Sequence, residues 1–304
     1  ALPICEGWED AGTPQLKKFS ELEAAGDRGK LLWLNDVSRM SAESRRQAFH
    51  LFLQAVKMHF VATYVNREPT LEELRSIEGQ FSASGFPGCI GCHDCMHVTW
   101  KNCPKALKGQ FKNPQVSKLA AISCEATCDM DLYCWHWLAG RPATNNDITV
   151  QDSRPLFIDI LLGRRRMHLP EGFVLEGKRR DWLLYFLVDG IYPQWSIFVR
   201  PMHFPANEQE AHMSKGQEAV RKAVERFFGC LQGRFRILRA EGFEWKLEDL
   251  VLISEVCVIL HNILVALGRK GELEEELDEE GNVLDGDALL EEFIDTSWSS
   301  EAEA

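Results

Sequence analysis

The 304-residue chain lacks the features that mark several special classes of protein. It has no run of about 18 uninterrupted apolar residues, because its most apolar late stretch, residues 251–266, is broken by Ser254, Glu255, His261 and Asn262. It has neither an initial Met nor a basic-then-apolar leader, so secretion is not supported, and a segment ahead of the first residue stays open. Its composition, 45% hydrophobic and 26% charged, excludes collagen, wholesale disorder and a minimal disulfide scaffold. We expect a globular protein of about two domains that does not span a membrane.

The formal net charge of −12 is distributed unevenly along the chain. Residues 271–304 contain 14 acidic residues and no basic ones, which leaves 32 acidic against 34 basic residues in residues 1–270. We interpret the acidic tail as disorder that aids solubility, or else as a shield for a basic groove or a docking segment. Basic runs lie at residues 164–166 and 178–180 and in an acid-free stretch before Lys118. These runs are either solvated loops or a surface for a phosphate backbone. In the acid-free stretch, the lysines that we assign to DNA binding are Lys101, Lys105, Lys108 and Lys112.

The sequence contains ten cysteines, but a chain of this length can bury a large core and needs no disulfides for its stability. We therefore expect reduced thiols in a cytosolic or nuclear setting. Four of them have the spacing C-x2-C-x2-C-x7-C, which can hold zinc or an iron–sulfur cluster. The same thiols also suit a buried strand, where they pack as small apolar groups, and no second C-x2-C half completes a standard zinc site. The spacing favours a structural role and leaves a metal centre open for Cys89, Cys92, Cys95 and Cys103.

Apolar periodicity predicts helices in residues 1–80 and a mixture of strands and helices from residue 81 to residue 268. Ser41 and Thr70 are predicted to cap the first two helices, the second with a capping box. Later helices are predicted to open near Asp147, at residues 214–231, and at residues 247–267 with Gly268 closing the last one. The predicted strands are residues 89–97, 119–124, 132–138 and 182–188. This order indicates an α/β layer fold, with a division into residues 1–80, 81–268 and an acidic tail at 269–304.

Three carboxylates stand out from this arrangement. Asp189 follows a seven-residue apolar run, the place where functional groups of α/β sheets project, although a turn former fits there too. Asp94 lies inside the first predicted strand, a costly place for a charge without a partner. Glu225 lies beside the apolar stripe of a helix, where pairing with Arg221 at i,i+4 is the simpler interpretation.

A single sheet can bring these three acids together at its carboxyl end. Ionised carboxylates about 4 Å apart repel by roughly 4 kcal/mol per pair at an effective dielectric constant near 20, so such a cluster calls for cations or shifted pKa values. Oxygen ligands suit Mg²⁺ or Mn²⁺, and two such ions can support phosphodiester cleavage. The residues therefore favour nuclease chemistry.

An ordered series of motifs runs through residues 40–261. The motifs are Gly85-Phe86-Pro87-Gly88, Asp94-Cys95-Met96-His97, Trp100-Lys101-Asn102-Cys103-Pro104, Asn145-Asn146-Asp147-Ile148, residues 153–157, Asp189-Gly190-Ile191-Tyr192-Pro193, Val224-Glu225-Arg226 with Phe228-Gly229, and Leu260-His261-Asn262. This series resembles the PIF/Harbinger class of DDE transposases, in particular the plant-transposon-protein branch.

The resemblance implies an RNase H-like nuclease fold, a mixed central sheet flanked by helices, preceded here by an N-terminal helical segment. It implies a catalytic and metal-binding triad of Asp94, Asp189 and Glu225, with 35 residues between the last two. It also implies that the triad binds two divalent ions, Mg²⁺ or Mn²⁺. Such an enzyme nicks DNA with water and then joins a freed 3′-hydroxyl elsewhere. The family also implies a nuclear location and a separate Myb-like DNA-binding partner, while a homo-oligomer stays open. Cys92 and His93 depart from the small and aliphatic residues usual before the first Asp.

Two rival hypotheses remain beside this one. A domesticated relative would associate with DNA without cutting it, and the intact triad counts against it. A cysteine-ligated metal protein would contain stoichiometric zinc or iron, but Cys95 and Cys103 fall within family motifs that carry no cluster. His97 is predicted to be a core, hydrogen-bonding or metal-supporting histidine outside the catalytic set, and His261 a structural histidine on the last helix.

Overall fold

The structure of the protein is a computed structural model that describes residues 41–112, 119–143, 155–162, 167, 169–170, 172–175, 177–180, 184–239, 242 and 244–277. The chain divides into two units, residues 1–55 and 56–304, which we describe separately. In the first unit, the described residues belong to the start of helix α4 (Ala42–Tyr64), which crosses the boundary. The predicted cap is present, because the Ser44 amide donates to the Ser41 hydroxyl at 3.0 Å. The predicted division at residues 80 and 268 stays a prediction.

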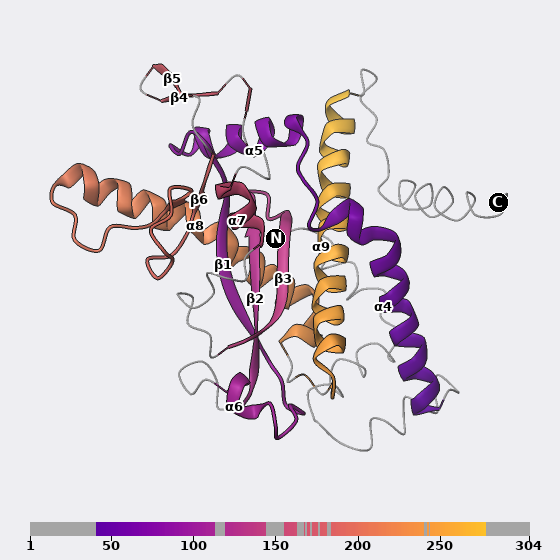
Figure 1. The fold of residues 1–304 in the computed structure, drawn as a ribbon. Coiled ribbons are helices and arrows are strands. Elements are labelled where there is room, and N and C mark those ends of the chain that lie inside the picture. The colour runs from indigo at the N-terminus through magenta and orange to yellow at the C-terminus, as the bar shows by residue number, and fades with distance from the viewer. Residues whose placement is uncertain are drawn as a thin grey trace. The chain divides into compact units, whose positions relative to one another are not determined.

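The second unit is built on a mixed five-stranded sheet in the order β3-β2-β1-β6-β7 (Figure 1). Strands β1 (Cys89–Thr99), β2 (Ala121–Cys128) and β3 (Cys134–Pro142) form an antiparallel meander. The short strands β6 (Tyr185–Leu187) and β7 (Phe198–Val199) continue the sheet parallel to β1. A separate hairpin joins β4 (Phe173–Leu175) to β5 (Lys178–Arg180). The predicted α/β class with a mixed central sheet flanked by helices is confirmed.

Five further α-helices and a short 3-10 helix accompany the sheet in the described part of the chain. Helix α5 (Leu71–Ala83) begins with the predicted capping box between Thr70 and Glu73. Helices α6 (Lys108–Phe111) and α7 (Pro155–Leu161) are short. The two long helices are α8 (Glu208–Arg234) and α9 (Leu247–Leu277), with the 3-10 helix η3 (Arg236–Leu238) between them. Helices α5 and α8 contact β1, and α9 contacts β3, as Figure 1 shows for α9 beside the meander.

Alternate side chains of β1 reach opposite layers of helices. Cys92 and Met96 contact α8, the former through a bond from its thiol to the Val220 carbonyl. His93 points the other way and packs edge-on against Phe157 of α7 at 4.7 Å between ring centroids. Because the side-chain period of a strand is two residues, Asp94 belongs to the face that α8 covers.

The open edge of β3 is closed by asparagine side chains. Asn66 accepts from the Trp137 amide and donates to the Trp137 carbonyl, both at 2.9 Å. Asn262 of α9 makes the same paired contact with Cys134, at 2.9 and 2.6 Å, and also donates to the Tyr64 carbonyl. These amides satisfy backbone groups that would otherwise attract another strand. The Leu260-His261-Asn262 motif thus has a structural role.

Several predicted boundaries differ from the structure. Gly268 does not end α9, which continues to Leu277. The predicted strand at residues 182–188 is reduced to β6, and residues 182–183 lie outside the described residues. The helix opening near Asp147 also lies outside them, and the described α7 begins at Pro155.

Residues 247–268 form a helical segment that is long and apolar enough to cross a membrane by length and composition alone. It is not an uninterrupted apolar run, because Ser254, Glu255, His261 and Asn262 lie within it. Half of the segment is buried within the structure, and the core helix of a soluble protein passes the same test. Its Ser254, His261 and Asn262 are buried and hydrogen-bonded, which fits packing against protein.

Candidate active site

Neighbouring parallel strands place Asp94 and Asp189 close to each other. Cys92 of β1 pairs with Leu187 of β6, and each aspartate lies two residues further along its strand direction. The carboxylates therefore project from the same face of the sheet, towards α8. Each is also fixed locally, because Asp94 accepts from the Cys95 amide at 2.8 Å and Asp189 accepts from the Gly190 amide at 2.6 Å.

Helix α8 brings Glu225 and Arg221 to these aspartates. The guanidinium of Arg221 donates through Nη1 to Asp94 Oδ2 at 2.7 Å and through Nη2 to Glu225 Oε1 at 2.8 Å. The side chains of Arg221 and Asp94 are 13% and 19% exposed, whereas that of Glu225 is 48% exposed. One cation thus links two carboxylates that lie 131 residues apart in the sequence.

The third carboxylate, that of Asp189, acts on Asp94 electrostatically. Burial raises the pKa of Asp94, and the charges of Asp189 and Glu225 raise it further, while the Cys95 amide and the Arg221 charge oppose them. Burial by itself lowers the pKa of Arg221, but the charges of the three carboxylates hold it above its usual value. Arg221 therefore supplies the positive charge that the cluster requires. The sequence identified it only as a partner of Glu225.

The donor set suits a hard divalent cation, but the described side chains are not arranged around one. Among the described residues, no three His, Cys, Asp or Glu side chains lie close enough together to hold a metal ion. The carboxylates converge on the Arg221 guanidinium instead. Carboxylate oxygens are the ligands that Mg²⁺ and Mn²⁺ prefer, so the residues fit such ions chemically. An ion bound here would compete with Arg221 for oxygens of Asp94 and Glu225.

The predicted DNA-binding lysines lie on the segment that follows β1. All four are exposed, and Lys108 begins α6. These lysines follow the end of β1, the strand that contains Asp94. Among the described ion pairs, the carboxylates of Asp94 and Glu225 pair with Arg221 and not with these lysines. Lys118 and residues 164–166 lie outside the described residues. The four described lysines are Lys101, Lys105, Lys108 and Lys112.

The metal centre that the cysteine spacing left open is not assembled among the described residues. All nine cysteines there are free thiols. Cys89 and Cys92 are buried in β1, and burial raises the pKa of the Cys89 thiol to about 12. Burial thus keeps this thiol protonated as a small apolar group in the core. The structural interpretation of these cysteines is the one that the described geometry supports.

Three histidines near these motifs have distinct surroundings. His97 is exposed on β1. His93 is fully buried, with Nδ1 3.0 Å from the Thr127 hydroxyl, so the unusual residue before Asp94 repacks the opposite face of the strand. His261 is buried on α9, with Nε2 2.9 Å from the Leu132 carbonyl and Nδ1 3.0 Å from an Arg234 nitrogen. Burial is the main cause that lowers its pKa, to about 4, as expected for a structural histidine.

Comparison with protein families finds one model along most of this unit. The model described as "Plant transposon protein" matches residues 62–272. This range includes Asp94, Asp189 and Glu225.

Curated relatives are similar at low identity. A cattle protein named "Putative nuclease HARBI1" is 26% identical over 190 residues, which is 62% of this chain and 49% of that protein. The human protein of the same name is 24% identical over 190 residues, with the same two shares. "Protein ALP1-like" of Arabidopsis thaliana is 24% identical over 196 residues, 64% of this chain and 47% of that protein. The chain thus spans about half the length of the curated relatives it matches. No solved structure matches it.

Proposed function

Because the chain belongs to the plant transposon protein family, we propose that it is a divalent-metal-dependent DNA endonuclease and strand-transferase of the transposase type. Its relatives named as nucleases support the nuclease part of this proposal. We assign the catalytic and metal-binding roles to Asp94, Asp189 and Glu225.

The arrangement of these three acids about Arg221 is the observation that carries the proposal. Asp94 comes from the middle of β1, Asp189 from just beyond β6, and Glu225 from α8. Asp94 and Glu225 share the Arg221 guanidinium, and the charge of Asp189 acts on both Asp94 and Arg221. A turn-forming aspartate or a surface ion pair explains any one of these acids, but not their mutual interaction. A partly buried acid such as Asp94, with a raised pKa and charged neighbours, is typical of functional sites.

The sheet supports an RNase H-like fold. Its antiparallel meander is followed by parallel strands on the side of β1, in the order β3-β2-β1-β6-β7. That order puts the first aspartate on the central strand and the second on its parallel neighbour. Asp189 lies just beyond the carboxyl end of β6, where functional groups of open α/β sheets gather, whereas Asp94 lies within β1.

In the proposed reaction, a water oxygen attacks phosphorus and the bond to the 3′-oxygen breaks, which leaves a 3′-hydroxyl and a 5′-phosphate. The freed 3′-hydroxyl then attacks a phosphorus of the target strand. Two Mg²⁺ or Mn²⁺ ions, when bound, activate the attacking oxygen and stabilise the leaving one. Asp94, Asp189 and Glu225 would hold these ions. In the metal-free protein, Arg221 balances the charge of the same carboxylates.

We propose that recognition of the DNA ends depends on a separate Myb-like protein in the nucleus. The four exposed lysines after β1 give nonspecific phosphate contacts, which are salt-sensitive and carry little sequence information. Binding of terminal repeats by the purified chain alone would overturn this part of the proposal.

The test is nicking of supercoiled plasmid by the purified chain with Mg²⁺ or Mn²⁺, with and without a Myb-like partner. Asp189→Asn removes a proposed ligand, and Glu218→Gln, an exposed change on α8, is the matched control. We expect nicking by the wild type and the control but not by Asp189→Asn. Equal nicking by Asp189→Asn would refute the assigned site. Folded protein that nicks in no mixture would indicate a DNA-associated adaptor that does not cleave.

A further inference from the structure

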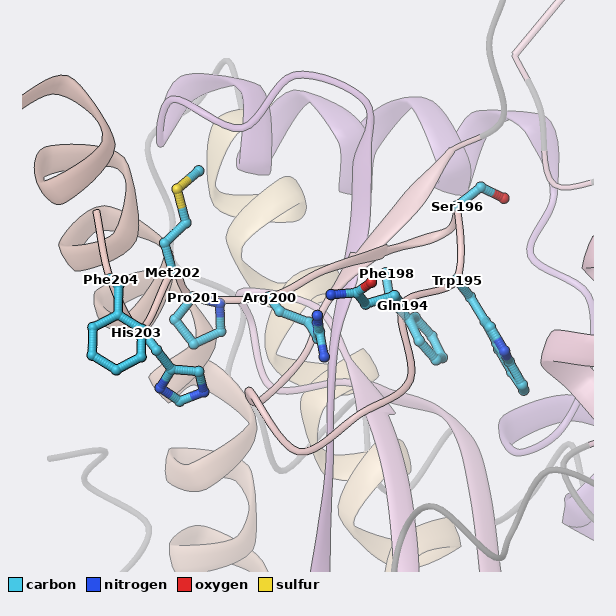
Figure 2. Close-up of a pocket in the computed structure, with 9 residues that line it drawn as sticks. All are labelled: Gln194, Trp195, Ser196, Phe198, Arg200, Pro201, Met202, His203 and Phe204. Carbon is cyan, nitrogen blue, oxygen red and sulfur yellow. The ribbon is translucent and has the colours of Figure 1, made fainter. Parts of the chain in front are cut away.

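A pocket opens beside Asp189, on the segment that leaves the sheet. It has a volume of about 710 Å³ and is lined by residues 194–196, 198 and 200–204. Figure 2 shows the rings of His203 and Phe204 at one end and that of Trp195 at the other, with the Arg200 guanidinium between them. A volume of this size accommodates a ligand as large as a nucleotide.

The segment that forms the pocket is anchored rather than loosely exposed. Arg200 donates through Nη1 to the Tyr192 carbonyl at 2.8 Å and to the Gly190 carbonyl at 3.3 Å. The Met202 amide donates to the Ser214 hydroxyl at 3.0 Å, and that hydroxyl donates back to the Met202 carbonyl at 3.3 Å. The pocket is therefore tied to the turn after Asp189 and to α8.

Aromatic rings are displayed on this anchored segment. Phe204 is 95% exposed and stands between Pro205 and His203, so a large apolar ring is held in solvent next to a residue with a fixed backbone. Trp195 stacks on Phe198 with 5.3 Å between ring centroids and an interplanar angle of 17°. The segment therefore combines one exposed ring with a stacked pair, the half-buried Trp195 and the buried Phe198, on the same pocket.

The pocket directly adjoins the carboxylate cluster. The His203 imidazole packs so closely on Gly190 that a Cβ there would lie 2.5 Å from Nε2. Gly190 is the neighbour of Asp189, and its amide donates to the Asp189 carboxylate. The pocket residue His203 thus touches the direct neighbour of a proposed catalytic group.

We propose that this pocket binds an unpaired nucleotide of the DNA strand that is cut at Asp189. The inference rests on the proposed nuclease function for its location, and it adds the part of the substrate that the pocket takes. Exposed aromatic rings stack on bases of any sequence, and a guanidinium beside them suits the adjoining phosphate. Bases inside a duplex are already stacked on their neighbours, so only an unpaired nucleotide offers a free base face to Phe204 or to Trp195, which stand at opposite ends of the pocket (Figure 2).

Binding in EDTA tests the pocket without any cleavage. Fluorescence anisotropy would compare a labelled single-stranded oligothymidylate with a blunt duplex of equal length. Phe204→Ala removes an exposed ring without opening the core, and Trp245→Ala is the matched control, because Trp245 is 72% exposed and does not line the pocket. We expect Phe204→Ala to weaken single-strand binding about tenfold, in the range of base–aromatic stacking. Duplex binding and the Trp245→Ala protein should be unchanged.

Equal single-strand binding by wild type and Phe204→Ala would overturn the proposal, as would the absence of single-strand binding by the wild type. An equal loss with Trp245→Ala would also overturn it, since the effect would not belong to this surface.

A second measurement separates this proposal from the nuclease proposal. An oligonucleotide with one 4-thiothymidine should crosslink under ultraviolet light to the peptide containing residues 194–204. Crosslinking there by a protein that nicks no plasmid would support the pocket while the nuclease proposal fails. Nicking without any crosslink to this peptide would support the nuclease proposal and overturn the pocket proposal.

Discussion

Replacing Arg221 with Met should destabilise the metal-free protein and favour metal binding. The substitution keeps most of the side-chain length and removes the charge that balances Asp94 and Glu225. It leaves three carboxylates near one another without their cation, and the least exposed of them, Asp94, loses a charged bond of 2.7 Å. Both effects raise the free energy of the folded state.

The size of the effect follows from the burial of each pair. Two unit charges about 4 Å apart attract by roughly 4 kcal/mol at an effective dielectric constant near 20. Desolvation offsets part of this attraction, and the pair with Glu225 is half exposed and worth less than about 1 kcal/mol. We therefore expect a net loss of about 2 kcal/mol in the free energy of unfolding. For a unit of this size the loss lowers Tm by about 4–8 °C.

Thermal unfolding followed by circular dichroism in EDTA measures this change. Arg226→Met, an exposed change on the same helix, is the control and should leave Tm nearly unaltered. Adding Mn²⁺ should raise the Tm of Arg221→Met at lower concentration than that of the wild type, because no guanidinium competes for the carboxylates. In an Asp94→Asn background the Arg221 substitution should cost much less. A Tm in EDTA equal to that of the wild type, or the same cost in both backgrounds, would refute the reasoning.

Three further predictions concern the fold around the site. Asn262→Ala should lower the free energy of unfolding by about 3 kcal/mol in urea titration, since it leaves the buried amide and carbonyl of Cys134 without their bonds to Asn262; an effect below about 1 kcal/mol would contradict this. Thr70→Ala should cost about 1 kcal/mol in the same assay, and Thr70→Ser, which keeps the capping hydroxyl, should restore most of it. Stability should fall as the pH drops from about 6.5 towards 4, because unfolded His261 binds a proton that the folded histidine, with a pKa of about 4, does not. His261→Gln should lose this dependence between pH 6.5 and 5, and an unchanged pH profile would show that another group causes it.

The local features of the fold could be predicted from the sequence because local chemistry determines them. The strand containing Asp94 begins at Cys89 as predicted, since a turn with glycines at positive φ precedes it. The capping box at Thr70 is also where the sequence placed it.

The incorrect boundaries show where local signals are too weak to decide. A glycine ends a helix only if it adopts a left-handed conformation, and inside a helix it costs only about 1 kcal/mol. Residues after Gly268 are mostly Glu and Leu, which favour helix, so α9 continues to Leu277. The apolar run before Asp189 suggested a seven-residue strand, but the described strand is limited to Tyr185–Leu187, next to a two-residue β7.

The candidate site could be predicted only in part. Asp94, Asp189 and Glu225 were identified from their positions in predicted elements and from a family resemblance. The role of Arg221 was not, because its i,i+4 spacing to Glu225 already explained it, whereas its bond to Asp94 spans 127 residues. A contact of that separation depends on how the helix lies on the sheet.

The two roles of Arg221 have a consequence for the energetics of the site. The guanidinium stabilises the metal-free fold through the carboxylates that we assign to metal binding, so each interaction opposes the other by linkage. If Arg221 contributes about 2 kcal/mol, an ion that displaces it would bind about thirtyfold more weakly, because 1.4 kcal/mol is a factor of ten in affinity. Helix α8 carries both the cation and one of its carboxylates, so a shift of the Arg221 side chain can release Asp94 without unfolding the helix. In the proposed nuclease, the phosphate of the DNA strand would offer the guanidinium another anion, which would favour metal binding when DNA is bound.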